Sequence, residues 1–474
     1  MTMDTNSESY LRGLELAEAG RYEEALACIE QHLQQVPEDA QALNDTGAIL
    51  HCLGRSAEAI HHLMRARNLQ RNCAEIAWNL VEAYLADGKA SEAAQLFGDM
   101  ERLGILNPDV LNRAANVFLN QDNKADAIDV LLYSLRLWPE QEILKPMIEV
   151  IRSQRAKIAF FCGHSDDLGS LADICEFTKM RLPTELFQSQ NLDEMYRLMK
   201  WSDISWFEGC SDMAVEASKL PKVCKMVVNV RYHDAYDRWP AQVQWDNIDA
   251  LITAGNQFVK DALVKQAPDI KNHTWMVTIP SGINLDKFKF VSRPRGKNLA
   301  CVGQLDINKN PMFLLQCMQK LHYIDPEYKL FFAGSFQSLM LQQYIKHIVQ
   351  ALELTDVVLF EGWQQDVNSW LQDKHYIISG SIGQGQGVGL LEGMACGLKP
   401  VIHNFPGANQ IFPPEFLFNI SEQFCQQILS DQYEPERYRR FVEENYSLAE
   451  ELKKINSILI QLSADIKSNA TCKI

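Results

Sequence analysis

The chain has 474 residues, which is too long for one ordinary domain and predicts about three. Its composition, 47% hydrophobic and 22% charged, can build sizeable cores, and a net charge of −16 argues against a nucleic-acid partner and against a large basic surface for membrane docking. The 12 cysteines have no metal-ligand spacing, and neither a signal peptide nor an apolar run of transmembrane length is seen, which favours a cytoplasmic protein with reduced thiols.

Small residues recur with a fixed period through the first third of the chain. They stand 34 residues apart, which resembles the tetratricopeptide repeat, where small residues let paired helices cross closely. The recurring positions are Ala25, Ala59, Ala93 and Ala127 in one register and Gly20, Gly54 and Gly88 in another. We predict about four repeats, at 6–39, 40–73, 74–107 and 108–141, and a closing helix at 142–155 whose apolar residues, Ile143 among them, recur at helical spacing.

A repeat array over residues 1–155 predicts an α-solenoid with a concave face. Such faces commonly hold an extended peptide or a partner protein. The alternative interpretations are a rigid spacer and a dimerisation surface. We expect partner binding, although the sequence names neither the partner nor the oligomeric state.

Short apolar segments that alternate with helical patterns begin at Lys157. Strands are predicted at 158–162, 204–207, 225–230, 250–254 and 276–279, and helices between them include 192–201 and 257–265. Strands that alternate with helices indicate a parallel, doubly wound sheet. We assign residues 156–292 to this first α/β domain.

A second series of strands follows the polar segment 293–297. Its strands are predicted at 299–302, 328–334, 357–362, 376–379 and 400–402, and residues 437–461 form an amphipathic helical pattern. We assign residues 293–440 to a second α/β domain and 441–474 to a C-terminal helix and tail. The predicted fold class is therefore α plus α/β, a repeat solenoid followed by two Rossmann-like domains.

The most informative stretch is 383–402, where a glycine-rich loop runs into an apolar helix that carries one acid, Glu392. Glycines before a helix let main-chain N–H groups approach an anion, which the helix dipole also favours. An acid further along such a unit can hold ribose hydroxyls. The loop matches neither the dinucleotide-binding nor the P-loop pattern, so by itself a plain loop is the simpler interpretation.

The same stretch resembles the signature of retaining GT-B glycosyltransferases of family 4, written E-x7-E-x-M-A-x-G-x-P-V-I. The positions that fit in register are Glu392, Met394, Ala395 and Gly397. Residues 400–402 fit after one extra residue, whereas Gln384 replaces the first acid. Residues 280–288 resemble the family segment P-x-G-V-D-x-x-x-F. The resemblance implies a GT-B unit over roughly 156–460, in which the second domain binds a nucleotide-diphosphate sugar.

The resemblance also implies roles for individual residues on the donor side. The family has arginine and lysine five residues apart after the first strand of the second domain; here Lys309 fills the lysine position and Gln304 replaces the arginine. A solvent-facing loop lysine and a core or surface tryptophan are the alternatives for Lys309 and Trp363. The expected donor-binding residues are Gly303, Gln304, Lys309, Trp363, Gly385, Gln386, Gly387, Val388 and Glu392.

The expected catalytic residues are His233, Gln384 and Lys309. His233 and Asp234 follow a strand of the first domain, where family members often carry a His-Asp pair that faces the sugar. The alternative is a structural histidine that caps the next turn, and Asp234 could instead fix the orientation of the imidazole. Gly163 and His164 end the first strand, where the cleft opens, so with Asp234 they are expected on the acceptor side. No metal site and no cofactor are expected.

We therefore expect a glycosyltransferase that uses a nucleotide-diphosphate sugar without a metal ion and, by resemblance, with retention of configuration. The fusion of repeats to a GT-B unit is similar to enzymes that glycosylate proteins, so we expect the acceptor to be a protein or peptide that the repeats recruit. The second expectation is a surface glycan or a lipid-linked acceptor. The glutamines at 304 and 384 leave two further alternatives, an unusual sugar donor or a repeat scaffold whose transferase site has decayed.

Overall fold

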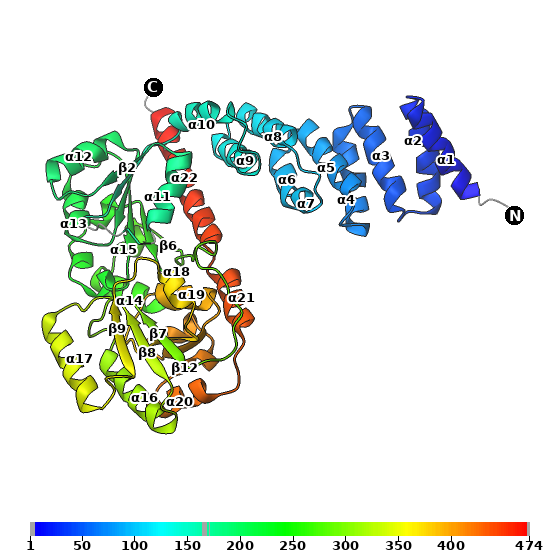
Figure 1. The fold of residues 1–474 in the computed structure, drawn as a ribbon. Helices are drawn as coiled ribbons and strands as arrows, with labels where there is room; N and C mark the ends of the chain where they lie inside the picture. The colour runs from blue at the N-terminus through cyan, green and yellow to red at the C-terminus, as the bar shows by residue number, and fades with distance from the viewer. Residues whose placement is uncertain (1–4, 164–167, 170, 472–474) are drawn as a thin grey trace. The chain divides into compact units, whose positions relative to one another are not determined.

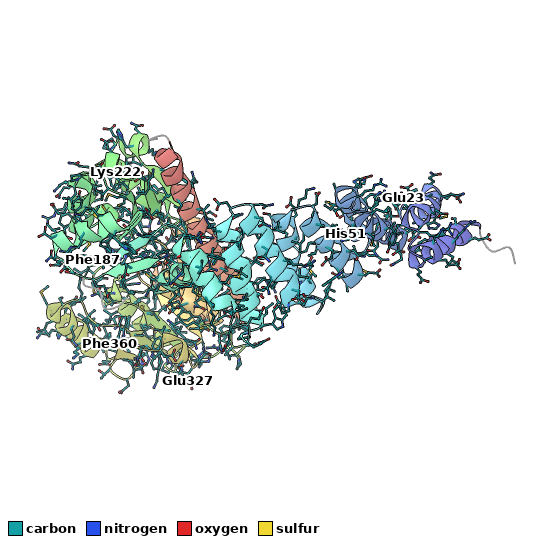
Figure 2. The ribbon with its side chains drawn as sticks, turned by 90° about the horizontal axis from the view of Figure 1, so that it is seen from above. Glu23, His51, Phe187, Lys222, Glu327 and Phe360 are labelled. Carbon is teal, nitrogen blue, oxygen red and sulfur yellow. The ribbon has the colours of Figure 1, made fainter. Side chains whose placement is uncertain are left out.

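The computed structural model describes residues 5–163, 168–169 and 171–471 (Figure 1). The chain divides into two compact units. The first comprises residues 1–155 together with 180–182, and the second comprises the rest. Figure 2 adds the side chains, with Glu23 and His51 labelled in the first unit.

The first unit consists of helices that pack in consecutive antiparallel pairs. They are α1 (Thr5–Glu18), α2 (Tyr22–Gln35), α3 (Ala40–Cys52), α4 (Ser56–Leu69), α5 (Ala74–Ala86), α6 (Ala90–Ala94), α7 (Phe97–Arg102), α8 (Pro108–Asn120), α9 (Lys124–Leu137) and α10 (Leu144–Ser153). The periodic alanines are fully buried between the paired helices. The periodic glycines have φ near +70°, because each ends the first helix of its pair in the left-handed conformation. The predicted repeat solenoid is confirmed.

Two local features of the repeats differ from the prediction. The second helix of the third pair is broken into α6 and α7, and Gly98, a weak helix former, lies in α7 just after the break. In the closing helix α10, Leu144, Ile148 and Ile151 are buried, whereas Ile143 precedes the helix and is 79% exposed. Helical spacing identified the buried face of α10 but placed Ile143 on it wrongly.

The first half of the second unit contains a parallel six-stranded sheet in the order β2-β1-β3-β4-β5-β6. Its strands are β1 (Ile158–Phe161), β2 (Thr184–Phe187), β3 (Ile204–Glu208), β4 (Lys225–Val230), β5 (Ala250–Thr253) and β6 (Trp275–Thr278). The helices are α11 (Leu171–Arg181), α12 (Leu192–Trp201), α13 (Asp212–Lys219), α14 (Gln257–Gln266) and α15 (Ile270–His273), with short 3₁₀ turns at 234–236, 239–241 and 245–247. The strand order reverses between β1 and β3.

The second half repeats this plan with a sheet in the order β12-β11-β10-β7-β8-β9. Its strands are β7 (Asn298–Val302), β8 (Lys329–Ala333), β9 (Val358–Gly362), β10 (Tyr376–Ser379), β11 (Lys399–His403) and β12 (Leu417–Phe418). The helices are α16 (Pro311–Ile324), α17 (Leu339–Ala351), α18 (Val367–Leu371), α19 (Val388–Ala395), α20 (Ser421–Leu429), α21 (Pro435–Asn445) and α22 (Leu448–Thr471), with 3₁₀ turns at 408–410 and 414–416. Strand order reverses between β7 and β10, where ligands bind in open α/β sheets.

The end of the chain crosses back to the first half. Instead of one helix at 437–461, the structure has α21 and α22, which are separated by Tyr446 and Ser447. Hydrogen bonds to Ile283, which lies between β6 and β7 where the chain first passes from one half to the other, fix the break. Ile283 N–H donates to the Tyr446 carbonyl (2.7 Å), and Leu448 N–H donates to the Ile283 carbonyl (3.1 Å). Helix α22 then packs on β3 of the first sheet. No helix within the described residues is both long and apolar enough to cross a membrane.

Candidate functional site

Two loops meet at the carboxyl edge of the second sheet, where the strand order reverses. The loop after β7 and the glycine-rich loop after β10 are joined through Asn308. Its side-chain Nδ2 donates to the Gly383 carbonyl (2.8 Å), and its own carbonyl accepts from Ile382 N–H (2.9 Å). The two loops therefore form one surface at the point where a doubly wound sheet binds ligands. Sequence reasoning missed Asn308.

Lys309 lies on this surface beside Gly303. The loop is held by a hydrogen bond from Lys309 N–H to Asp306 Oδ1 (2.7 Å), and Gly303 has φ +127°. A methyl group added at Gly303 would lie 3.2 Å from Lys309 Nζ, so the ammonium group lies against this glycine. In the part of the chain that the structure describes, Lys309 makes no ion pair. Its charge is therefore available to an anionic ligand, and Gln304 of the same loop is exposed.

Helix α19 begins at Val388 and directs its N-terminus to the same surface. Gly387 precedes it in the left-handed conformation (φ +77°), and the first intrahelical bond runs from Leu390 N–H to the Gly387 carbonyl (2.9 Å). The N–H groups of Val388 and Gly389 precede that bond and have no partner within the helix. An anion placed before them would gain these donors and the positive end of the helix dipole.

Glu392 lies on α19, a little over one turn beyond its start, and is half-buried. Burial raises the pKa of its carboxyl group to about 7, and the positive charges of Lys287 and Lys309 oppose that rise. The acid and Lys309 are therefore close enough to interact. Near neutral pH, Glu392 changes between a carboxylate that accepts hydrogen bonds and a neutral acid that also donates one.

The glycines before and within α19 are required mainly because other parts of the protein lie against them. A side chain at Gly389 would approach Val302 of β7 to 3.3 Å, and one at Gly393 would lie 2.6 Å from Ile377 of β10. A side chain at Gly387 would lie 2.5 Å from Gln384 Oε1. The close approach of α19 to the sheet, rather than an anion alone, thus requires several of these glycines.

The two glutamines of the loop point their side chains into the protein. Gln384 is 6% exposed, and its Nε2 donates to the hydroxyls of Ser379 (2.8 Å) and Ser381 (2.5 Å). Gln386 pairs with Ser281, accepting from its N–H (2.8 Å) and donating to its carbonyl (2.5 Å). The expected contact of Gln384 with a sugar hydroxyl would require its amide to leave these serines. With this pairing kept, Gln386 would contact a nucleotide sugar through its main chain.

The loop after β4 carries the predicted His-Asp pair. Asp234 is 7% exposed, and its Oδ2 accepts from the N–H groups of Cys210 and Arg231, both at 2.9 Å. It thereby joins the carboxyl ends of β3 and β4. Its Oδ1 lies 3.2 Å from Nε2 of His233, whose ring is exposed. Asp234 can therefore fix the orientation of the imidazole. Within the described residues, His233 precedes the 234–236 turn but makes no side-chain capping hydrogen bond to it.

The remaining predicted residues follow other strands or lie outside the described residues. Gly163 follows β1 with φ +67°, and His164 lies outside the described residues. Trp363 follows the edge strand β9 and is 68% exposed. Among the residues placed in the structure, no cluster of histidine, cysteine or acidic side chains has the geometry of a metal site, and the described cysteines are free thiols.

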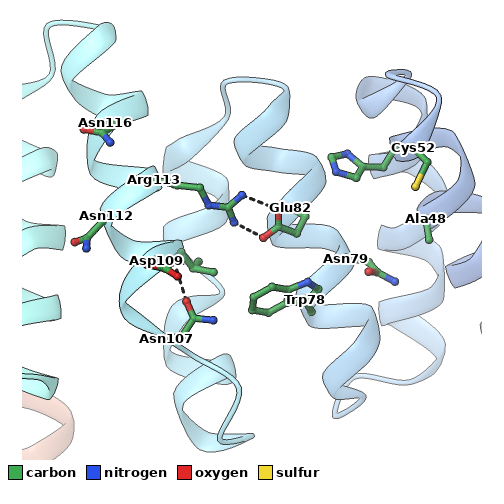
Figure 3. Close-up of a pocket in the computed structure, with 12 residues that line it drawn as sticks. Ala48, Cys52, Trp78, Asn79, Glu82, Asn107, Asp109, Asn112, Arg113 and Asn116 are labelled. Atoms are coloured by element: carbon green, nitrogen blue, oxygen red, sulfur yellow. Dashed lines mark hydrogen bonds and ion pairs between the residues drawn. The ribbon is translucent and has the colours of Figure 1, made fainter.

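A separate hollow of about 710 Å³ lies in the repeat unit (Figure 3). It is lined by α3, α5 and α8, the first helices of successive pairs. Side-chain amides, including those of Asn79, Asn112 and Asn116, share the lining with Trp78. Arg113 and Glu82 form a two-pronged ion pair across it. The hollow is thus a polar groove with both hydrogen-bond donors and acceptors.

Comparisons with known proteins agree with this architecture. Residues 283–457 match the family model described as "Glycosyl transferases group 1", and residues 10–68 match the one described as "Tetratricopeptide repeat". The second half of the chain is thus similar to group 1 glycosyltransferases, and a segment near its start is similar to tetratricopeptide repeats. A comparison with curated protein sequences found no match.

Solved structures with a similar fold cover about two thirds of this chain. Sucrose-phosphate synthase from Thermosynechococcus elongatus has a TM-score of 0.55 at 14% identity, over 66% of this chain and 100% of that one. Anabaena Alr3699/HepE, in complex with UDP-glucose, has a TM-score of 0.53 at 15% identity, over 65% and 100%. A glycosyltransferase from Rickettsia africae has a TM-score of 0.52 at 16% identity, over 65% and 99%. The predicted GT-B fold is confirmed.

Proposed function

We propose that this protein is a glycosyltransferase that moves a sugar from a nucleotide-diphosphate sugar to an acceptor. One observation carries the proposal: the unpaired ammonium of Lys309 and the first N–H groups of α19 share one surface, where the strand order reverses. A diphosphate is the group that fits a cation together with a helix N-terminus. Because Anabaena Alr3699/HepE is described in complex with UDP and with UDP-glucose, UDP-sugars are the first donors to test.

Each site residue would bind a different group of the donor. When the bond from the sugar to the diphosphate breaks, negative charge grows on the departing phosphate, and Lys309 with α19 would stabilise it without a metal ion. Glu392, as a carboxylate, would accept hydrogen bonds from the ribose hydroxyls. Trp363 would contact the base, and His233 would face the sugar from the first half. Retention of configuration follows from the family resemblance alone.

The repeat groove supports a protein or peptide as acceptor. Asn116 is exposed, and its amide offers a donor and an acceptor that match the alternating N–H and C=O groups of an extended main chain. The Nδ2 groups of Asn79 and Asn112 already donate to Asn44 and Gln141. Glu82 and Arg113 neutralise each other, so the groove does not require a strongly charged partner. A second function, a repeat scaffold with a decayed transferase site, is favoured by one observation: Gln384 is turned into the protein.

A donor screen tests the proposal. UDP-, GDP- and ADP-sugars are added to the full chain, and thermal stabilisation and released nucleoside diphosphate are measured. At least one donor should stabilise the protein and be hydrolysed slowly. Lys309→Ala should weaken that donor's binding tenfold or more, because a charge-assisted contact to phosphate is lost. The control, Lys346→Ala, removes an exposed lysine on α17 and should change binding less than twofold. Stabilisation by no donor would favour the scaffold.

A further inference from the structure

The first half of the second unit contacts the glycine-rich loop directly through Tyr232. Tyr232 follows β4 in the sequence, yet a methyl group added at Gly383 would overlap its hydroxyl oxygen and lie 2.6 Å from its Cζ. A methyl group at Gly385 would lie 3.2 Å from Tyr232 Cβ. The phenol tip of Tyr232 therefore lies against Gly383, and its Cβ and main chain lie near Gly385. A side chain at Gly383 would therefore require Tyr232 to move, whereas one at Gly385 would require a shift of only a few tenths of an ångström.

A second residue of the first half, Asn256, holds the same loop by hydrogen bonds. Its side chain is fully buried and Nδ2 donates to the carbonyls of Gln384 (3.1 Å) and Pro406 (3.4 Å). Its Oδ1 accepts from Phe258 N–H (2.9 Å), which fixes the amide at the start of α14. A side chain at Gly407 would lie 2.7 Å from Asn256 Nδ2. One amide thus connects α14 to two loops of the other half, and all of its strong groups are satisfied.

The contacts of Tyr232 and Asn256 concern the part of the site that would receive the sugar of a bound nucleotide sugar. Lys309 and Glu392, which the proposed function assigns to the diphosphate and the ribose, both belong to the second half. Tyr232 and Asn256 act instead on 383–385, the part of the loop that faces the first half and lies ahead of α19. A sugar joined to a diphosphate at the start of α19 would extend toward this part of the loop. The shape of the loop, and hence the fit of the sugar, depends on residues of the opposite half.

We propose, on the basis of the proposed function, that Tyr232 and Asn256 are positioning residues for the donor sugar: from the first half they hold the glycine-rich loop in the conformation that receives it. They do not touch the nucleoside. Their removal therefore weakens the binding of a nucleotide sugar while the binding of the corresponding nucleoside diphosphate is retained. A purely structural role would weaken both ligands alike or neither.

Calorimetric titration of the full chain with UDP-glucose and UDP, or with the matched GDP or ADP pair that the donor screen selects, tests this assignment. Tyr232→Ala should lower the affinity for the sugar nucleotide tenfold or more and the affinity for the nucleoside diphosphate less than twofold. Tyr323→Ala, which removes an 81% exposed tyrosine, is the control and should change neither. Asn256→Asp keeps the side-chain shape but loses the Nδ2 donor, so it should act in the same direction. Equal weakening of both ligands in Tyr232→Ala, or no weakening, would overturn the assignment.

Coupling between the ring and the loop provides an independent readout if Asn256→Asp fails to fold. Gly383→Ala should weaken the sugar nucleotide tenfold or more in the wild type, because the new methyl group displaces Tyr232. In the Tyr232→Ala background, Gly383→Ala should lower the affinity for the sugar nucleotide less than twofold. Additive losses would overturn the role of Tyr232. A wild type that binds neither ligand would instead overturn the proposed function, and the positioning role with it.

Discussion

Glu392 illustrates how a site residue can oppose stability. A half-buried carboxyl group with a pKa of about 7 favours its neutral form in the folded state, whereas the unfolded chain ionises it near its ordinary value of 4.5. Between these two pH values the unfolded state becomes progressively favoured as pH rises. The acid therefore costs stability at pH 8 and almost none near pH 4. An acid kept at such a cost is typical of functional sites.

Replacing this acid should therefore stabilise the protein in a pH-dependent way. Glu392→Gln removes the ionisation, so it should raise the free energy of unfolding at pH 8 by about 1–3 kcal/mol, and by much less at pH 5, because one pKa unit corresponds to about 1.4 kcal/mol. Thermal unfolding at the two pH values measures the difference. The same variant should bind the donor more weakly at pH 8, since the ribose loses a charged acceptor. An equal change of stability at both pH values would contradict the raised pKa.

The sequence could predict some residues of the site and not others, for a physical reason. Lys309 and Glu392 were predicted because each matches a position of the family resemblance within its own segment, and their roles stay predictions. The partners of the loop could not be found in this way. Asn308 contacts Gly383 across 75 positions, and Asn256 contacts Gln384 across 128. Only the fold brings such pairs together, and their residue types carry no local pattern.

At the scale of elements, close helix packing explains why the repeats keep small residues. Gly47 lies in α3 with Leu63 of α4 directly against it, and a methyl group at Gly47 would lie 2.8 Å from Leu63 Cδ2. Gly98 in α7 has no atom within 4 Å of the position that a methyl group would take. The two glycines are therefore a matched pair, one required by packing and one not.

Alanine at these two positions should have opposite effects. Gly47→Ala should destabilise the repeat unit by about 1–3 kcal/mol, since an added methyl group in a packed interface forces α3 and α4 apart. Gly98→Ala should be neutral or stabilising by up to about 1 kcal/mol, because alanine is the better helix former. Hydrogen exchange of α3, α4 and α7 in the full chain measures both. A loss of protection in Gly98→Ala as large as that in Gly47→Ala would contradict this account of the packing.

The elements that the sequence could not predict lie at the sheet edges. Period-34 small residues, and apolar runs such as 225–230 with the helices between them, carry strong patterns because their residues are buried in a regular way. Strand β2 is an edge strand with an exposed Glu185, and β12 has only two residues, so neither forms an apolar run. The break between α21 and α22 follows from hydrogen bonds to Ile283, far away in the sequence.

At the scale of the whole molecule, the two units have different tasks in the proposed function. The repeat unit offers a polar groove and contains none of the predicted donor residues. The second unit contains both sheets and the loops at their carboxyl edges, and its halves are joined through Tyr232, Asn256 and the crossing segments at Ile283 and Tyr446. In the proposed function, the donor site would thus be built by the second unit as a whole rather than by its second half alone.

A crystal structure of the full chain with bound UDP, or with the nucleoside diphosphate that the donor screen selects, tests the central claim most directly. The account predicts the diphosphate within hydrogen-bond distance of Lys309 Nζ and of the N–H groups of Val388 and Gly389, with the ribose hydroxyls on Glu392. A nucleotide bound elsewhere in the molecule, or a surface at Lys309 and α19 that remains empty at saturating nucleotide, would contradict it.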